Sequence, residues 1–182
     1  MHDMREWVIS FLGAMYAGVV PVAINTLLTA DDYAYMLEHS RAQAILTNGS
    51  LVPMVQQALA HAQHEVNHIW VAHPEESGAA LPAAFEAMQP WLNRQQPLPH
   101  AAKTKGDDPG FWLYSSGSTG KPKGAVHTHA NPYWTAELYA KPVLGLTEND
   151  VCFSAAKLYF AYGLGNALNF PLSGGASVVL VA

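Results

Sequence analysis

Apolar segments of strand length alternate with segments of helical spacing along this 182-residue chain. Residues 69–72, Ile-Trp-Val-Ala, form a short apolar run, which is typical of a strand buried inside a parallel sheet. Residues 5–16 instead carry apolar side chains at helical spacing, and Gly18 follows them as a helix stop. Because parallel strands need long connections, usually helical, the alternation predicts an α/β fold: a mostly parallel sheet with flanking helices.

Capping signals set several of the expected boundaries. Thr29, followed by Asp32 three residues later, resembles a capping box at a helix start. Asn131 followed by Pro132 reads as an N-cap and a first helical position. With the periodicity, these signals predict helices at residues 5–16, 29–40, 53–65, 85–91, 131–139 and 163–170, and strands at residues 19–24, 44–47, 69–72, 110–114, 124–127, 151–155 and 176–181.

The chain divides at an irregular stretch. Residues 74–109 hold Pro, Gly, Ala and scattered charge, and they separate a first α/β segment (1–73) from a second (110–182). The chain opens on a helix with no strand before it and stops on an apolar strand of the kind found inside sheets. We therefore expect residues 1–182 to be an internal fragment of a larger domain. An exposed terminal strand would favour self-association.

Composition narrows the classes of partner. The net charge of −5 argues against nucleic acid as the main partner. Residues 11–24 are apolar but too short, and too interrupted by Gly and Pro, to span a bilayer, so no membrane contact is expected. The lone Cys152 excludes an internal disulfide and fits a reducing cytoplasm, which is the expected location.

Residues 114–124 read Tyr-Ser-Ser-Gly-Ser-Thr-Gly-Lys-Pro-Lys-Gly and follow directly on an apolar strand. The alternative of a flexible linker fits poorly, because linkers rarely follow such a run. Glycines allow backbone N–H groups to approach a ligand closely, and short hydroxyls and ammonium groups bind phosphate oxygens. The loop therefore predicts a polyphosphate site built from three glycines (Gly117, Gly120, Gly124), four hydroxyls (Ser115, Ser116, Ser118, Thr119) and two lysines (Lys121, Lys123).

The spacing excludes the commonest alternatives. A Walker A loop needs Ser or Thr after its Gly-Lys pair, and Pro122 stands there. A dinucleotide-binding Gly-x-Gly-x-x-Gly could begin at Gly163 and Gly165, but Leu168 occupies its third glycine position. A nucleophile elbow would need glycine at position 116, where the residue is Ser.

Residues 114–124 resemble, at every position, the signature loop of the adenylate-forming enzymes: acyl- and aryl-CoA ligases, luciferases and adenylation domains. The resemblance implies that the chain is a partial N-terminal AMP-binding domain of that fold. Lys121 falls at the variable position of the loop. The resemblance implies that the β- and γ-phosphates of ATP are bound by Ser115, Ser116, Gly117, Ser118, Thr119, Gly120 and Lys123.

Residues 25–33, 133–139 and 153–166 are similar, more narrowly, to benzoate-CoA ligases. That likeness implies a parent enzyme of aromatic acid degradation that converts benzoate, ATP and CoA, with Mg2+, to benzoyl-CoA, AMP and pyrophosphate through benzoyl-adenylate. A core aromatic cluster at a strand–helix junction is the structural alternative for residues 159–165. The likeness implies that the aryl pocket is lined by Phe160, Ala161, Tyr162 and Gly163.

Several family elements have no counterpart here. The resemblance places the acidic magnesium motif, the ribose-binding aspartate and the C-terminal lid with its catalytic lysine outside this chain. We therefore assign no catalytic and no metal-binding residue, and expect the chain alone to be inactive. His61, His64 and His68 are expected to form a solvated helix face. The open alternatives are a ligase for another aryl or a fatty acid, and a truncated, non-catalytic nucleotide-binding module.

Overall fold

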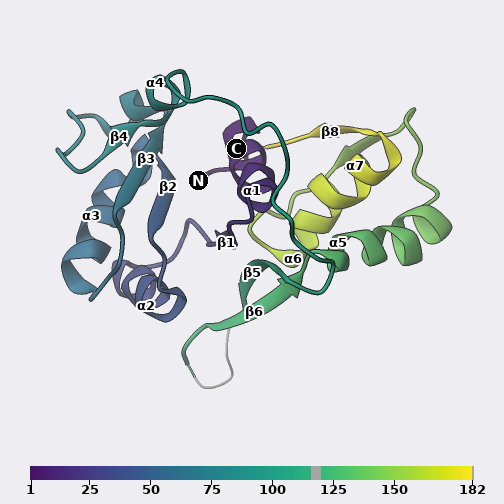
Figure 1. The fold of residues 1–182 in the computed structure, drawn as a ribbon, viewed down its shortest axis with the longest axis horizontal. Coiled ribbons are helices and arrows are strands. Elements are labelled where there is room, and N and C mark those ends of the chain that lie inside the picture. The colour runs from purple at the N-terminus through teal and green to yellow at the C-terminus, as the bar shows by residue number, and fades with distance from the viewer. Residues whose placement is uncertain (116–119, 182) are drawn as a thin grey trace. The chain divides into compact units, whose positions relative to one another are not determined.

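The computed structural model describes residues 1–115 and 120–181, which form two compact units (Figure 1). The first unit contains residues 1–2 and Thr26–Pro99, and the second contains Asp3–Asn25 and His100–Ala182. Both are α/β, and most strand pairs are parallel, which confirms the predicted fold class. No helix among the described residues combines the length and the apolar character that crossing a membrane requires.

The first unit is built on a three-stranded parallel sheet in the order β2-β3-β4. β2 and β3 pair without a break from Ala44 opposite His68 to Asn48 opposite Ala72. Its elements are α2 (Ala30–Ser40), β2 (Ala44–Asn48), a 3-10 turn (Gly49–Leu51), α3 (Val52–His61), β3 (His68–Ala72), a second 3-10 turn (Pro74–Ser77), β4 (Glu86–Ala87) and α4 (Met88–Leu92).

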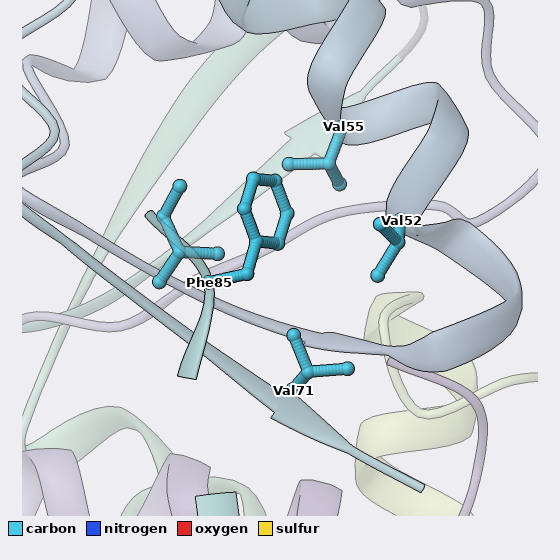
Figure 2. Close-up of a cluster of buried hydrophobic side chains, with 5 residues drawn as sticks. Val52, Val55, Val71 and Phe85 are labelled. Atoms are coloured by element: carbon cyan, nitrogen blue, oxygen red, sulfur yellow. The ribbon is translucent and has the colours of Figure 1, made fainter. Parts of the chain in front are cut away.

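A small apolar core joins α3 to this sheet. Val52 and Val55 on α3 point toward Val71 of β3 and toward Phe85, which precedes β4 (Figure 2). Ile69 completes the cluster, and Val71 has no exposed surface at all. Because valines at spacing three on a helix share one face, the sequence of α3 presents this stripe to the strand.

A complete capping box begins α2. The Thr29 hydroxyl oxygen accepts from the Asp32 backbone N–H at 3.2 Å, and one Asp32 carboxylate oxygen accepts from the Thr29 N–H at 3.1 Å. These bonds satisfy N–H groups that a helix start leaves without partners. The predicted cap is therefore confirmed.

The second unit contains two sheets. In one, β5 lies between β1, which runs parallel to it, and β6, which runs antiparallel; in the other, β7 pairs with β8. The elements are α1 (Arg5–Tyr16), β1 (Val22–Ala23), β5 (Pro109–Ser115), β6 (Lys123–Thr128), α5 (Ala130–Thr135) continued by a π-helical segment (Ala136–Leu144), β7 (Val151–Phe153), α6 (Ala161–Leu164) continued by a π-helical segment (Gly165–Asn169), α7 (Phe170–Gly174) and β8 (Ser177–Val179).

Stacked rings connect α1 to β5. Trp7 stacks on Phe11 with ring centroids 4.9 Å apart, and Phe11 meets the edge of Phe111 at 5.4 Å. His127 of β6 stacks on the same Phe111 ring at 4.7 Å. Trp7, Phe11 and Phe111 are buried, so this aromatic column anchors the central strand of the unit.

Some predicted boundaries are wrong. The helix expected at 53–65 ends at His61, and His68 lies in β3, so the three histidines do not share a helical face. His129, not Asn131, is the N-cap of α5, while the Asn131 side-chain oxygen accepts from the Thr128 N–H at 2.8 Å. Self-association through the terminal strand stays a prediction; Val179 of β8 is about half exposed.

Removing the cap hydroxyl should destabilise the first unit. We expect Thr29→Ala to lower the free energy of unfolding by about 1 kcal/mol, because the Asp32 N–H loses its acceptor. Thr29→Ser keeps the hydroxyl and should stay within about 0.5 kcal/mol of the wild type. Urea denaturation of the three proteins measures the difference. Equal losses in both variants would show that the hydroxyl contributes nothing.

Truncating a side chain at the centre of the apolar cluster should lower the free energy of unfolding more than Thr29→Ala does. Val71→Ala removes two methyl groups from a fully buried site, and we expect a loss of about 2 kcal/mol in unfolding free energy. Leu98→Ala deletes a larger group from the same unit, but Leu98 is 57% exposed, so its cost should stay below about 0.5 kcal/mol. Urea denaturation again reports both values, and a cost at Leu98 equal to that at Val71 would contradict the proposed core.

Candidate active site

The predicted phosphate loop lies between the two strands of a hairpin. Figure 1 shows β5 and β6 side by side, and their last pair is Ser115 opposite Lys123. Residues directly opposite each other in an antiparallel pair point to the same face of the sheet. The structure therefore brings together a hydroxyl and an ammonium group at the base of the loop, and both residues are exposed to solvent.

Burial and pairing hold that hairpin base in place. Phe111 and Leu113 alternate with half-buried neighbours along β5, and both are about 95% buried. β5 also pairs with β1 through Trp112 opposite Val22 and Leu113 opposite Ala23. Because side chains alternate along a strand, Ser115 lies on the same face as the two buried residues but beyond the core.

The middle of the loop is only partly described. Gly120 has a φ of +89°, a conformation that residues with a β-carbon rarely adopt, so glycine is needed there. Lys121 is exposed and lies beside Pro122, before β6 begins. Four predicted phosphate ligands lie outside the described residues: Ser116, Gly117, Ser118 and Thr119.

The predicted aryl pocket residues form the start of α6. Phe160 is its extended N-cap residue, and Ala161, Tyr162 and Gly163 form its first turn. The side chains of Phe160 and Tyr162 are 45% and 71% exposed. Tyr159, in contrast, is 4% exposed, so the structural alternative of a core aromatic cluster applies to this ring and not to its two neighbours.

Gly163 makes a close contact that explains the residue type. A β-carbon added there would lie 2.0 Å from the carbonyl oxygen of Lys157 and 2.5 Å from that of Ala156. Only glycine allows the first turn of α6 to pack against this backbone. Residues 156–163 therefore form a tightly folded loop that presents Phe160 and Tyr162 at its surface.

A buried carboxylate, which the sequence analysis missed, also contacts this loop. Both carboxylate oxygens of Asp3 accept from the backbone N–H of Leu158, at 3.1 and 3.2 Å. The two residues are 155 positions apart, and no local pattern links them. The only sequence signal is one acidic residue ahead of a helix in a chain with 13% charged residues.

Shifted titrations lie away from the two predicted sites. Hydrogen bonds from the backbone and then the hydroxyl of Thr147 lower the pKa of the exposed Asp150 carboxyl, ahead of β7. The hydrogen bond to Glu65 and the charge of Glu65 raise the pKa of Arg41 in the first unit. Both are exposed contacts, and neither involves a residue of the two predicted sites.

Comparison with known proteins shows which family this chain resembles in sequence and in structure. The model of the AMP-binding enzyme family matches residues 1–182. The chain is 51% identical to a benzoate--CoA ligase of Thauera aromatica over 99% of its own length and 32% of that protein. It is 52% identical to the crystal structure of a benzoate CoA ligase from Burkholderia xenovorans LB400, with a TM-score of 0.85 over 99% of this chain and 33% of that one.

A second solved structure with a similar fold is a ligase for a different acid. The anthranilate CoA ligase AuaEII, in complex with anthranoyl-AMP, is 35% identical with a TM-score of 0.92, over 100% of this chain and 34% of that one. The chain thus spans about a third of the length of the relatives it matches. Because the family model matches every residue, this chain belongs to the AMP-binding enzyme family.

Proposed function

We propose that the chain is part of the large AMP-binding domain of an aryl-CoA ligase that activates benzoate. The observation that carries the proposal is the 51% identity to a benzoate--CoA ligase across nearly the whole chain. The exposed Phe160 and Tyr162 on α6 support it, because an aryl acid needs flat apolar surface with few polar groups. We also propose the domain organisation expected from the sequence: a first α/β segment (1–73), an irregular connection (74–109) and a second α/β segment (110–182).

The proposed reaction has two steps. A benzoate oxygen attacks the α-phosphorus of ATP and pyrophosphate leaves, which gives benzoyl-adenylate. The CoA sulfur then attacks the acyl carbon, and AMP leaves. In the first step negative charge accumulates on the departing pyrophosphate, and a lysine near it stabilises that charge. In this proposal Lys123 and the hydroxyl of Ser115 bind these oxygens, and the pairing of the two residues at the hairpin base supports that role.

Mg2+ would accompany ATP and neutralise part of its phosphate charge. The residues that the structure describes contain no group of three His, Cys, Asp or Glu side chains that could hold a metal ion. We propose the cytoplasm as the location of this chain, since Cys152 is unpaired and such a thiol persists in a reducing compartment.

A substituted benzoate is the second candidate substrate. The structural likeness to an anthranilate CoA ligase in complex with anthranoyl-AMP favours it. A fatty acid is a further possible substrate of a ligase, and it would need a long apolar channel. The alternative to an enzyme is a nucleotide-binding module without catalytic activity.

An acid panel separates these candidates. We expect the full-length ligase containing this chain to form AMP with benzoate at a kcat/KM at least about 100-fold above that with palmitate, because a flat aromatic surface discriminates by shape. Benzoate, 2-aminobenzoate, 4-hydroxybenzoate and palmitate are compared by CoA-dependent AMP release. A preference for palmitate would exclude the aryl proposal, and no AMP release with any acid would support the binding module.

The two loop lysines should differ in effect. Lys123→Ala should raise the KM for ATP about tenfold or more, because a charge-assisted bond to phosphate is lost. Lys121→Ala removes the same charge two residues earlier and serves as the matched control; it should change that KM by less than about threefold. The KM for benzoate should stay unchanged in both variants. If both substitutions raised the KM for ATP equally, the effect would come from the positive charge of the loop as a whole and not from a specific contact of Lys123.

A further inference from the structure

The carboxylate of Asp3 is buried in the second unit. Asp3 is 5% exposed, and its two oxygens accept from the backbone N–H of Leu158 at 3.1 and 3.2 Å. Leu158 has no exposed surface. Burial of a charged carboxylate is unfavourable unless hydrogen bonds compensate it, so an apolar residue would be expected here if packing were the only requirement. The bond to Leu158 therefore calls for a specific explanation.

The segment that Asp3 holds leads directly to the proposed aryl pocket. Residues 157–160 form a turn in which the Phe160 N–H donates to the Lys157 carbonyl at 3.0 Å, and α6 begins at the next residue. Gly163 closes the loop by packing on the carbonyl oxygens of residues 156 and 157. The backbone is thus fixed by Asp3 at Leu158 and by close packing at Gly163. Phe160 and Tyr162 lie between these two points in the chain, and both are exposed.

A small displacement of the turn would move the pocket wall. Without the carboxylate, the buried N–H of Leu158 would lack this acceptor, and the turn would shift to find another one. Phe160 lies two residues further along, so its ring would move with the backbone. Binding sites tolerate such errors poorly, because misplacement by about 1 Å weakens contacts with a rigid ring.

We propose that Asp3 is a positioning residue for the aryl-acid pocket, acting through the Leu158 N–H to fix the turn that presents Phe160 and Tyr162. The inference rests on the proposed function, since it assigns the two exposed rings to the acid site. A positioning role and a general stabilising role of Asp3 predict different effects on the two substrates. Loss of Asp3 must affect the acid substrate selectively, while binding of ATP at the β5–β6 hairpin remains as in the wild type.

The test uses the full-length ligase that contains this chain. Asp3→Ala should raise the KM for benzoate about tenfold or more and change the KM for ATP by less than about threefold. Asp3→Asn keeps one oxygen acceptor of nearly the same position and should return the benzoate KM to within about threefold of the wild type. The preference for benzoate over the larger 2-naphthoate should fall in Asp3→Ala, because the ring wall is displaced.

Asp150→Ala is the matched control. Asp150 is another aspartate of this unit whose carboxylate accepts a backbone N–H, that of Thr147 at 2.8 Å, but it holds a different turn. This variant should leave the benzoate KM unchanged. If Asp3→Ala does not fold, Asp3→Glu takes its place: it keeps the charge and moves the carboxylate by one methylene, and should raise the benzoate KM about threefold or more with ATP unaffected.

Two results would overturn the inference with the ligase proposal intact. One is a benzoate KM that stays at the wild-type value in Asp3→Ala, or in Asp3→Glu where that variant replaces it. The other is a parallel rise of the KM values for ATP and benzoate, which would assign Asp3 a purely structural role. A wild-type enzyme that is inactive with every aryl acid is a separate result, because it removes the proposed function and this inference together.

Discussion

The pairing of β5 with a strand on each side is the constraint on which the second unit depends. Within the described residues, β5 is the middle strand of its sheet and has two partners, parallel β1 and antiparallel β6. Its buried Phe111 also receives the ring of Phe11 from α1 and the ring of His127 from β6. Because this strand cannot shift without breaking both ladders and the aromatic column, its end at Ser115 is a fixed point from which the predicted phosphate loop starts.

Local patterns made much of this arrangement predictable. The capping box at Thr29 and the strands predicted at 44–47 and 69–72 follow from residues within a few positions of each other, and the structure confirms them, with each strand one residue longer. The N-cap of α5 was predicted wrongly, because Asn131 instead accepts from the preceding Thr128 N–H, an alternative equally open to a short amide side chain. The separation of the strands into three sheets depends on long-range pairing that no local window contains.

The residues of the candidate site also differ in how far the sequence could predict them. The loop residues could be predicted because their pattern lies in eleven consecutive positions, and their binding of phosphate stays a prediction. The structure adds that Ser115 and Lys123 are paired across the hairpin. At the other site the sequence could not tell which ring is core: Tyr159 is buried, while its neighbour Phe160 is exposed. Asp3 could not be found at all, since its partner Leu158 becomes its neighbour only after folding.

The two predicted sites rely on different physics, and this separates their functions. The proposed phosphate site presents hydroxyl groups and a lysine, so its interaction with phosphate would be electrostatic and tolerant of the rest of the substrate. The α6 segment presents ring surfaces, and its discrimination depends on where the backbone places them. Under the proposed function, substitutions near α6 would therefore change the acid that is accepted while the hairpin stays the same. Such a separation agrees with the likeness of this one chain to a benzoate CoA ligase and to an anthranilate CoA ligase, at TM-scores of 0.85 and 0.92.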